Sequence, residues 1–205
     1  MKQNFISLFI SIPTIIIIFL IFYHLPVNDK SNTSITTNNL LYCIKQENTK
    51  DSILLHNHIE KHYNKVDSII KSYNSPINSK YLLELSYKHN IDPYFILAQG
   101  ILESHLGTTG RSKTTNSVFG VGMLDDGTSV RKYCYSNPNE SIEPYLILLK
   151  ERYFRHKDDY KYNHHNINHL LKTNTSYIDK NGNRYASAEN YESSLRFLYK
   201  KLIRL

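Results

Sequence analysis

The sequence has few of the residues on which several protein classes depend. Its two cysteines, Cys43 and Cys134, are too few for a disulfide scaffold and too far apart for a metal knuckle or a redox pair. An exported domain could still join them in one disulfide, although Cys134 lies in a strand-like run that fits a buried free thiol. No internal repeat is visible, so a repeat architecture is not expected.

Acidic residues are in the minority. The 18 Asp and Glu residues against 25 Lys and Arg residues give a net charge of +7, which favours an anionic partner over a cationic one. The basic residues are spread along the chain without a recognition motif, so nucleic acid is not the expected partner. With 40% apolar and 21% charged positions, the 205 residues fit one globular domain with an appendage, and exclude a disordered tail, a collagen and a multi-span transporter.

Charged residues are absent from one long run near the N-terminus. Residues 5–23 read FISLFISIPTIIIIFLIFY, and about 20 apolar residues span a bilayer as a helix. A cleaved signal peptide would have a shorter apolar region followed by small residues, whereas YHLP follows here. We therefore expect an uncleaved transmembrane anchor over residues 1–27. Lys2 precedes the run, whereas the charges of Asp29 and Lys30 cancel after it, so the body is expected on the extracytoplasmic side.

The remaining chain divides by its pattern of polar and apolar residues. A polar, aperiodic stretch predicts a tether over residues 28–50. Apolar residues at helical spacing predict a stalk or docking helix over 51–78. A short helix from about Ser79 to His89 follows, and an amphipathic helix from Tyr191 to Leu205 ends the chain. The predicted fold class is α+β and mostly α.

One helix, beginning after Asp92, has the best local signals. Asp92 fits the N-cap, Pro93 the first helical position, and Gly107 the stop, while Ile91 is placed to pack against Ile96. After it, Asp126-Gly127 between two β-rich runs predicts a hairpin or small sheet lobe. Helices with one small β lobe resemble the lysozyme-like architecture, with a cleft between the two parts.

A carboxylic acid lies near the end of that helix. Spacing places Glu103 on the same face as Gln99 and Gly100, a face that is otherwise apolar or small. Partial desolvation there would raise the pKa of Glu103 and keep a proton available for a leaving oxygen, as general acid catalysis on a glycosidic bond requires. A solvent-facing helical Glu is the alternative. Gly100 favours the acid, because a residue without a side chain leaves room for a ligand.

Four blocks in order carry a family resemblance. The segment IDPYFILAQGILESHLG, residues 91–107, resembles the helix of the glucosaminidase family of peptidoglycan hydrolases, glycoside hydrolase family 73. NSVFGV at 116–121, the segment from Tyr133 to Tyr145, and YAS at 185–187 with Tyr191 also resemble family motifs. Together the four blocks are specific, and the resemblance covers roughly residues 79–205, the expected glucosaminidase-like catalytic domain. A bacterial wall with anionic polymers also suits the net charge.

The resemblance implies a membrane-anchored endo-β-N-acetylglucosaminidase that hydrolyses the glycan strands of peptidoglycan. It implies that Glu103 is the catalytic acid and that Tyr185 is the active-site tyrosine. The positions that shape or line the groove would be Gln99, Ser104, Asn116, Phe119, Gly120 and Tyr191, although Phe119 and Tyr191 also fit the core.

The sequence departs from the family in two places. Ala188-Glu189 stands where the family prefers Asp-Pro, and the expected β lobe between Gly122 and Tyr133 is short. Its carboxylates, Asp125 and Asp126, fall in the expected hairpin turn, where Asp is usually structural, so no second catalytic carboxylate is assigned. The nucleophile would then be the substrate's own acetamido group, with Tyr185 assisting, or a water activated elsewhere.

Other functions fit parts of the sequence. A lytic transglycosylase on a lysozyme-like fold is the second enzyme candidate, although its G-L-M-Q-like block is not in this sequence. A non-catalytic wall-binding module would not need Glu103 but fits the missing second carboxylate. His165 and His169 form an i, i+4 pair beside His164, yet they lie in a polar stretch without a metal-binding motif, so no metal or cofactor is expected. A phage lysis or tail enzyme is also open.

Overall fold

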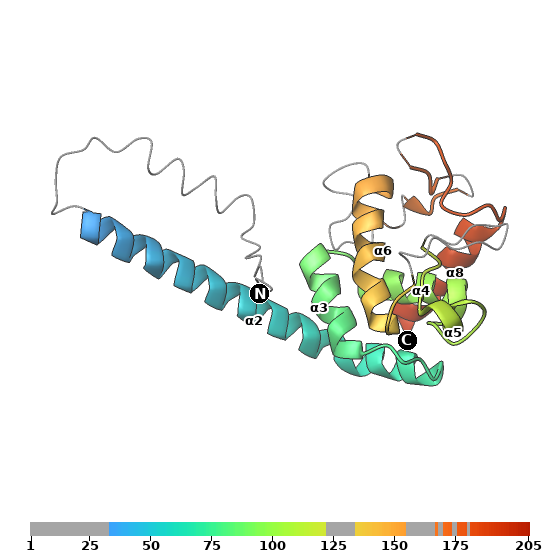
Figure 1. The fold of residues 1–205 in the computed structure, drawn as a ribbon, viewed down its shortest axis with the longest axis horizontal. Helices are drawn as coiled ribbons and strands as arrows, with labels where there is room; N and C mark the ends of the chain where they lie inside the picture. The colour runs from blue at the N-terminus through green and yellow to red at the C-terminus, as the bar shows by residue number, and fades with distance from the viewer. Residues whose placement is uncertain (1–32, 122–133, 155–166, 168–169, 174–175, 180) are drawn as a thin grey trace, which may run out of the picture. The chain divides into compact units, whose positions relative to one another are not determined.

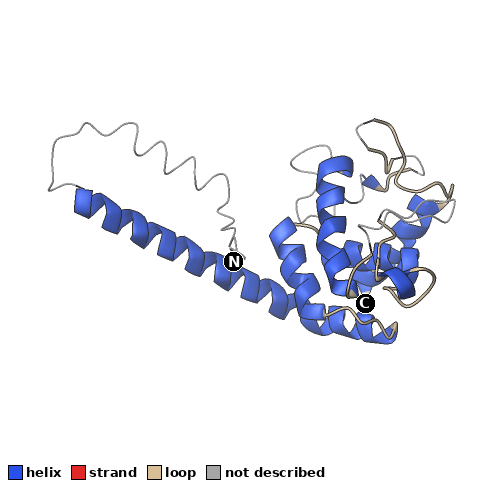
Figure 2. Ribbon diagram, in the orientation of Figure 1, coloured by secondary structure: helices blue, strands red, loops and turns tan. Residues whose placement is uncertain are grey.

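The computed structural model describes residues 33–121, 134–154, 167, 170–173, 176–179 and 181–205 (Figure 1). By its internal contacts the chain divides into two units, residues 1–50 and 51–205. The secondary-structure elements of the described ranges are all helices (Figure 2). The mostly helical fold class is therefore confirmed. The predicted β lobe and its Asp126-Gly127 turn fall on residues 122–133, outside the described residues.

The predicted anchor, residues 1–27, also lies outside the described residues. Among the helices that are described, none has the length and apolarity that crossing a bilayer requires.

The helix α2 runs from Thr33 to Ser72 and includes residues of both units. Sequence analysis predicts a tether over 28–50, but the helix already begins within that range. Residues 33–50 contain neither proline nor glycine, the two residues that most disfavour a helix. In the second unit α2 contributes Val66, Ile69 and Ile70 to the core. It ends before Asn74, whose φ of 51° belongs to the left-handed region.

The next two helices begin at residues whose side chains cap them. Helix α3 (Ser79–His89) begins where the side chain of Asn78 accepts a hydrogen bond from the backbone of Tyr81, and ends at the left-handed Asn90. Helix α4 (Pro93–Ser104) begins where the Asp92 carboxylate accepts from the backbone of Tyr94 at 2.8 Å. Each such cap stabilises its helix by about 1 kcal/mol.

Helix α4 ends earlier than the predicted stop at Gly107. His105 and Leu106 already have φ values of 48° and 57°. The Leu106 N–H bonds to the carbonyl of Gly100 at 2.9 Å, and the Leu106 side chain is fully buried. Burial of this leucine therefore turns the chain before the glycine is reached.

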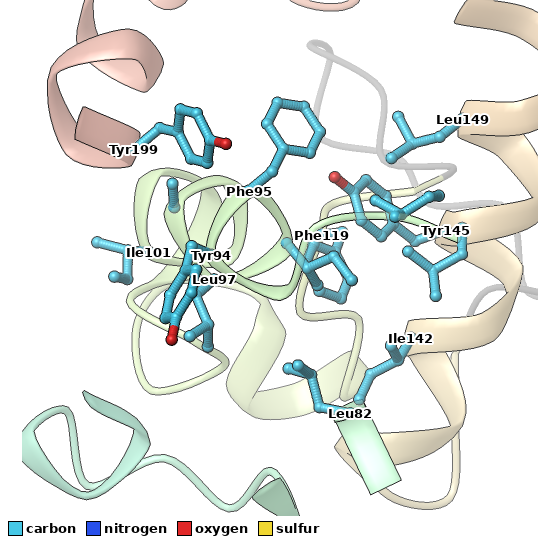
Figure 3. Close-up of a cluster of buried hydrophobic side chains, with 14 of the residues drawn as sticks. Leu82, Tyr94, Phe95, Leu97, Ile101, Phe119, Ile142, Tyr145, Leu149 and Tyr199 are labelled. Atoms are coloured by element: carbon cyan, nitrogen blue, oxygen red, sulfur yellow. The ribbon is translucent and has the colours of Figure 1, made fainter. Parts of the chain in front are cut away.

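The core of the second unit is built around α4 (Figure 3). Phe95, Ile96 and Leu97 are completely buried, and each contributes about 1.5–3 kcal/mol through burial. The close-up shows side chains of α3, α6 (Ile142–Leu148) and α8 (Tyr191–Arg204) around them. Helices α4 and α8 share the most extensive contact between two elements of the described chain.

The C-terminal half completes this frame. A 3₁₀ turn, η2 (Pro138–Ser141), leads into α6, and the π-helical η3 (Leu149–Tyr153) follows. The side chain of Asn137 caps η2, and Pro144 fits within the first turn of α6, where its missing N–H costs nothing. A turn forms at Asn181-Gly182, where the carboxylate of Asp179 accepts from the backbone of Asn181 at 2.8 Å.

Two short helical or bridge features remain. Helix α5 (Ser112–Thr115) follows the turn after α4, and an antiparallel bridge joins Ile178 to Arg184. The prediction that Cys134 is a buried strand residue is wrong, because this cysteine is free and exposed in an irregular segment. Its backbone neighbour Tyr135 bonds to Thr115 rather than to a strand partner in the described residues.

Candidate active site

Glu103 is next to last in α4 and is partly exposed. One carboxyl oxygen, Oε1, accepts a short hydrogen bond from the hydroxyl of Tyr191. The other, Oε2, lies beside Gly120, where a Cβ atom would come within 3.4 Å of it. Burial raises the pKa of Glu103 to about 7, and the Tyr191 hydrogen bond opposes that rise. Near neutral pH this carboxyl group is therefore poised between its acid and its base form.

Tyr191 connects two helices at this point. It is the first residue of α8, and it is buried. Its hydroxyl donates to Glu103 and accepts from the amide nitrogen of Gln99 at 3.1 Å. Burial raises the pKa of Tyr191 well above its usual value, so the phenol stays protonated and can donate.

Gln99 lies one helical turn before Glu103 and is completely buried. Its amide oxygen accepts from the hydroxyls of Tyr145 and Tyr177, at 2.5 and 3.1 Å. Sequence analysis places Gln99 at the substrate groove by resemblance. In the structure its partners are side chains of the protein, and it holds the tyrosine that contacts the acid.

A group of tyrosines lies next to the acid. The rings of Tyr177 and Tyr185 are stacked, with centroids 4.7 Å apart, and Tyr185 lies 5.5 Å from Tyr191. Tyr185 is partly exposed, and its hydroxyl donates to the carbonyl of Phe119 at 3.4 Å. Burial and then the charge of Glu103 raise the pKa of Tyr185 well above its usual value. This tyrosine is therefore a neutral donor close to the acid.

An ion pair fixes the two site tyrosines relative to each other. Arg184 precedes Tyr185, and Glu192 follows Tyr191. The Arg184 guanidinium donates to the Glu192 carboxylate at 2.8 Å, and Glu192 is only 1% exposed. Breaking such a pair by removing one partner typically costs about 3–5 kcal/mol. The segment with Tyr185 is thus fastened to the start of α8.

The segment after α5 forms the other side of the acid. Phe119 is buried and stacks on Tyr145 with centroids 3.9 Å apart, so its contacts are those of the core. Gly120 has a φ of 65°, a conformation that favours glycine, and it borders Glu103. Gly120 therefore brings its backbone, without a side chain, next to Oε2.

Ser104 and Asn116 shape this segment through hydrogen bonds. Ser104 is buried, donates to the carbonyl of Val118 at 2.6 Å and accepts from the backbone of Gly107. Asn116 is left-handed at the end of α5, and its side chain donates to the carbonyl of Tyr135 at 2.9 Å. Both residues hold the chain that carries Phe119 and Gly120.

The interpretation of Gly100 as room for a ligand is wrong. A Cβ atom there would lie 2.8 Å from the Leu106 side chain and 3.2 Å from that of Phe119. Gly100 is needed because the core packs directly onto the helix backbone. The glycine at this position therefore reflects close packing of the core and does not indicate a ligand site.

The structure thus brings Gln99, Glu103, Phe119, Gly120, Tyr185 and Tyr191 together. Sequence reasoning missed Tyr145, Tyr177, Arg184 and Glu192. Tyr145 was inside a resembling block, so its place in the pattern could have suggested a role. Tyr177 lies in a polar stretch whose sequence has no comparable signal.

Other candidate sites are not part of this arrangement. His164, His165 and His169, and likewise Asp125 and Asp126, lie outside the described residues. Within the described ranges, no three His, Cys, Asp or Glu residues gather as a metal site would need. A groove of about 740 Å³ lies along α2 and α3, between residues 52 and 84, and includes none of the residues around Glu103.

Comparison with known proteins gives one match. The family model Glucosaminidase, described as mannosyl-glycoprotein endo-beta-N-acetylglucosaminidase, matches residues 79–204. No curated protein and no solved structure matches the chain. The matched range begins at the first residue of α3 and ends at the last residue of α8, so it includes Glu103, Tyr191, Gln99 and Gly120.

Proposed function

Because the chain belongs to the Glucosaminidase family, we propose that it is an endo-β-N-acetylglucosaminidase of peptidoglycan in which Glu103 is the general acid. The family supports hydrolysis of peptidoglycan glycan strands in general. The observation that carries the finer proposal is the state of Glu103: its pKa is about 7, Oε1 is bound to Tyr191, and Oε2 lies beside the backbone of Gly120. Hydrolysis of a glycosidic bond needs such a carboxylic acid.

The chemistry of the first step follows from this state. Below about pH 7 Glu103 is neutral and donates its proton to the glycosidic oxygen as the C–O bond breaks. The carboxylate that remains keeps the hydrogen bond from Tyr191, which favours its charge. Tyr185, a neutral phenol next to the acid, is placed to donate to the substrate or to its acetamido group.

The second half of the reaction has two candidates. Among the described residues, no second carboxylate contributes to the shifted pKa of Glu103. If residues 122–133, which lie outside the described ranges, supply no second carboxylate, the nucleophile is the acetamido group of the substrate or a water molecule activated elsewhere. Acetamido participation retains the anomeric configuration, whereas direct attack by water inverts it. Proton NMR of the first product formed distinguishes the two.

The test of the function is product analysis. The full-length protein, purified in detergent, is incubated with purified peptidoglycan, and the fragments are identified by mass spectrometry. Reducing N-acetylglucosamine ends are the expected result. Anhydro-muramyl ends would instead make the protein a lytic transglycosylase. Absence of fragments from several wall types, with binding retained, would make it a wall-binding module.

We also propose that residues 1–27 anchor the protein in the cell membrane, with the second unit on the extracytoplasmic side. The support is the uncharged apolar run of residues 5–23 and the position of Lys2 before it. The full-length protein should sediment with membranes, and protease added to intact spheroplasts should digest residues 51–205. A soluble protein, or a protected second unit, would contradict the anchor or its orientation.

A further inference from the structure

A buried network behind Glu103 begins at Gln99. The side chain of Gln99 is 0% exposed, and its amide is engaged at both ends. Oε1 accepts from Tyr145 and Tyr177, so both phenol protons have an acceptor. This orientation of the amide gives both phenol protons an acceptor, whereas a reversed amide would present N–H groups to the same two hydroxyls. The nitrogen, Nε2, therefore faces Tyr191.

The orientation of Gln99 sets the direction of the next hydrogen bond. An amide nitrogen only donates, so the Tyr191 hydroxyl oxygen accepts from it at 3.1 Å. A phenol has one proton, and that of Tyr191 points to Oε1 of Glu103. Burial raises the pKa of Tyr191, so this proton stays on the phenol.

The two oxygens of Glu103 are thereby made unequal. A neutral carboxyl group has one oxygen that carries the proton and one that accepts hydrogen bonds well. Since Oε1 accepts from Tyr191, the proton belongs on Oε2. Oε2 is the oxygen that lies beside Gly120, a residue that has no side chain.

We propose that Gln99, acting through Tyr191, places the acid proton of Glu103 on Oε2, and that both residues are positioning residues for its transfer. This rests on the proposed role of Glu103 as the general acid. In the transfer, the O–H bond at Oε2 breaks and the glycosidic C–O bond breaks with its electron pair on the leaving oxygen, which takes the proton. The negative charge left on Glu103 accepts the hydrogen bond from Tyr191.

The experiment measures kcat, KM and the pH dependence of kcat/KM for the full-length protein on purified peptidoglycan. Tyr191→Phe removes one hydroxyl and keeps the ring. Because the Tyr191 bond opposes the raised pKa of Glu103, its loss should move the alkaline limb of the profile to higher pH. Loss of an oriented bond to a carboxyl group should also lower kcat about tenfold on the acid plateau, with KM changed less.

Gln99→Glu tests the direction of the bond. The variant has the same shape, but the new carboxylate accepts where the amide donated, so the proton of Tyr191 turns away from Glu103. The alkaline limb should again move to higher pH, and kcat should fall by a similar factor. The double variant with Tyr191→Phe separates this route from the added charge. If Gln99 acts through Tyr191, the double variant should be little worse than the worse single variant.

Tyr199→Phe is the matched control. It removes another buried hydroxyl of α8, one that donates to Asp92 at 2.8 Å, away from Glu103. This variant should unfold at a lower temperature than the parent but keep the parent's pH profile. If its profile shifts like that of Tyr191→Phe, a general loosening of α8 explains the effect and the proposal is overturned. If Gln99→Glu does not fold, Gln99→Met takes its place in the comparison of single and double variants.

The outcomes distinguish this proposal from the proposed function. Full turnover by Glu103→Gln would contradict the proposed role of Glu103 as the general acid. If Glu103→Gln is inactive but Tyr191→Phe keeps the parent's pH profile, only the placement of the proton fails. Strictly additive losses in the double variant would show that Gln99 does not act through Tyr191.

Discussion

Each end of α4 has an acidic residue that accepts a hydrogen bond from a tyrosine of α8, but the two acids have different roles. At its start, the Asp92 carboxylate accepts from the hydroxyl of Tyr199, and near its end the Glu103 carboxyl accepts from the hydroxyl of Tyr191. Both tyrosines belong to α8, two turns apart. The same helix pair therefore carries two acid–tyrosine contacts.

The two acids differ in their hydrogen-bond donors and in the end of the helix at which they lie. Asp92 is 2% exposed and also accepts the backbone N–H of Tyr94, at the end of the helix where the macrodipole is positive. Glu103 lies at the negative end of the same helix, and burial dominates the rise of its pKa to about 7. The carboxyl group at the start of the helix therefore serves as its cap, whereas the pKa of the one near its end is raised to about 7. The two acids of one helix thus differ as a structural cap and a candidate catalytic acid.

The largest expected effect comes from Glu103→Gln. The amide is nearly isosteric and still accepts from Tyr191 through its oxygen, but it cannot transfer a proton. Turnover should fall by roughly 10² to 10⁴, measured as release of soluble fragments from peptidoglycan, while substrate binding is kept. Undiminished turnover would contradict the mechanism, and a much lower melting temperature would show that Glu103 is a structural residue like Asp92.

The pH dependence of stability sharpens the same contrast. The pKa of Glu103 is raised from 4.5 to about 7 on folding. Between these two pH values the unfolded chain loses the proton while the folded chain keeps it, so the stability contributed by the neutral form is lost as pH rises. Its contribution should fall by at most about 3 kcal/mol across this window.

Glu103→Gln has no proton to lose at this position, so it serves as the reference. Urea denaturation of parent and variant at pH 4 and pH 8 should show that the variant gains stability relative to the parent at the higher pH. A constant difference between the two proteins would mean that Glu103 ionises as freely in the folded state as in the unfolded chain.

Asp92→Ala should have the opposite signature to Glu103→Gln. It removes the N-cap of α4 and the acceptor of the Tyr199 hydroxyl, which together should lower the free energy of unfolding by about 2 kcal/mol. Turnover per folded molecule, measured well below the melting temperature, should stay within about twofold of the parent. An altered pH profile of kcat/KM would show that the two ends of the helix are coupled.

Local signals predicted the helices that hold the site. Asp92 caps α4 where the sequence indicates, and α3 has the predicted bounds, since a helix start depends on the residues next to it. The early end of α4 could not be predicted in this way, because it depends on the burial of Leu106 against the rest of the core. The requirement for glycine at position 100 could not be predicted either, because it depends on how closely Leu106 and Phe119 pack against the helix.

The residues of the site were predicted better than their roles. The resemblance named both Tyr185 and Tyr191, which lie six residues apart in one motif. Which phenol reaches Glu103 depends on where the chain turns into α8, and on the Arg184–Glu192 pair that fastens the turn. Neither follows from spacing along the sequence, because the carboxyl group and its donor are 88 residues apart.

Tyr185→Phe should have the smallest effect of the substitutions at the site. The phenol donates to the carbonyl of Phe119 at 3.4 Å, a long hydrogen bond, and its ring stays stacked on Tyr177 without the hydroxyl. The variant leaves Glu103 and its Tyr191 bond in place, so kcat should fall by about tenfold or less while the melting temperature is kept. Phe119 is the acceptor of this bond through its backbone, so the loss of the hydroxyl leaves the stacking of Phe119 on Tyr145 intact. A loss as large as that of Glu103→Gln, measured in the same fragment-release assay, would make Tyr185 an essential partner in the reaction, whereas no loss would leave Tyr191 as the tyrosine on which the acid depends.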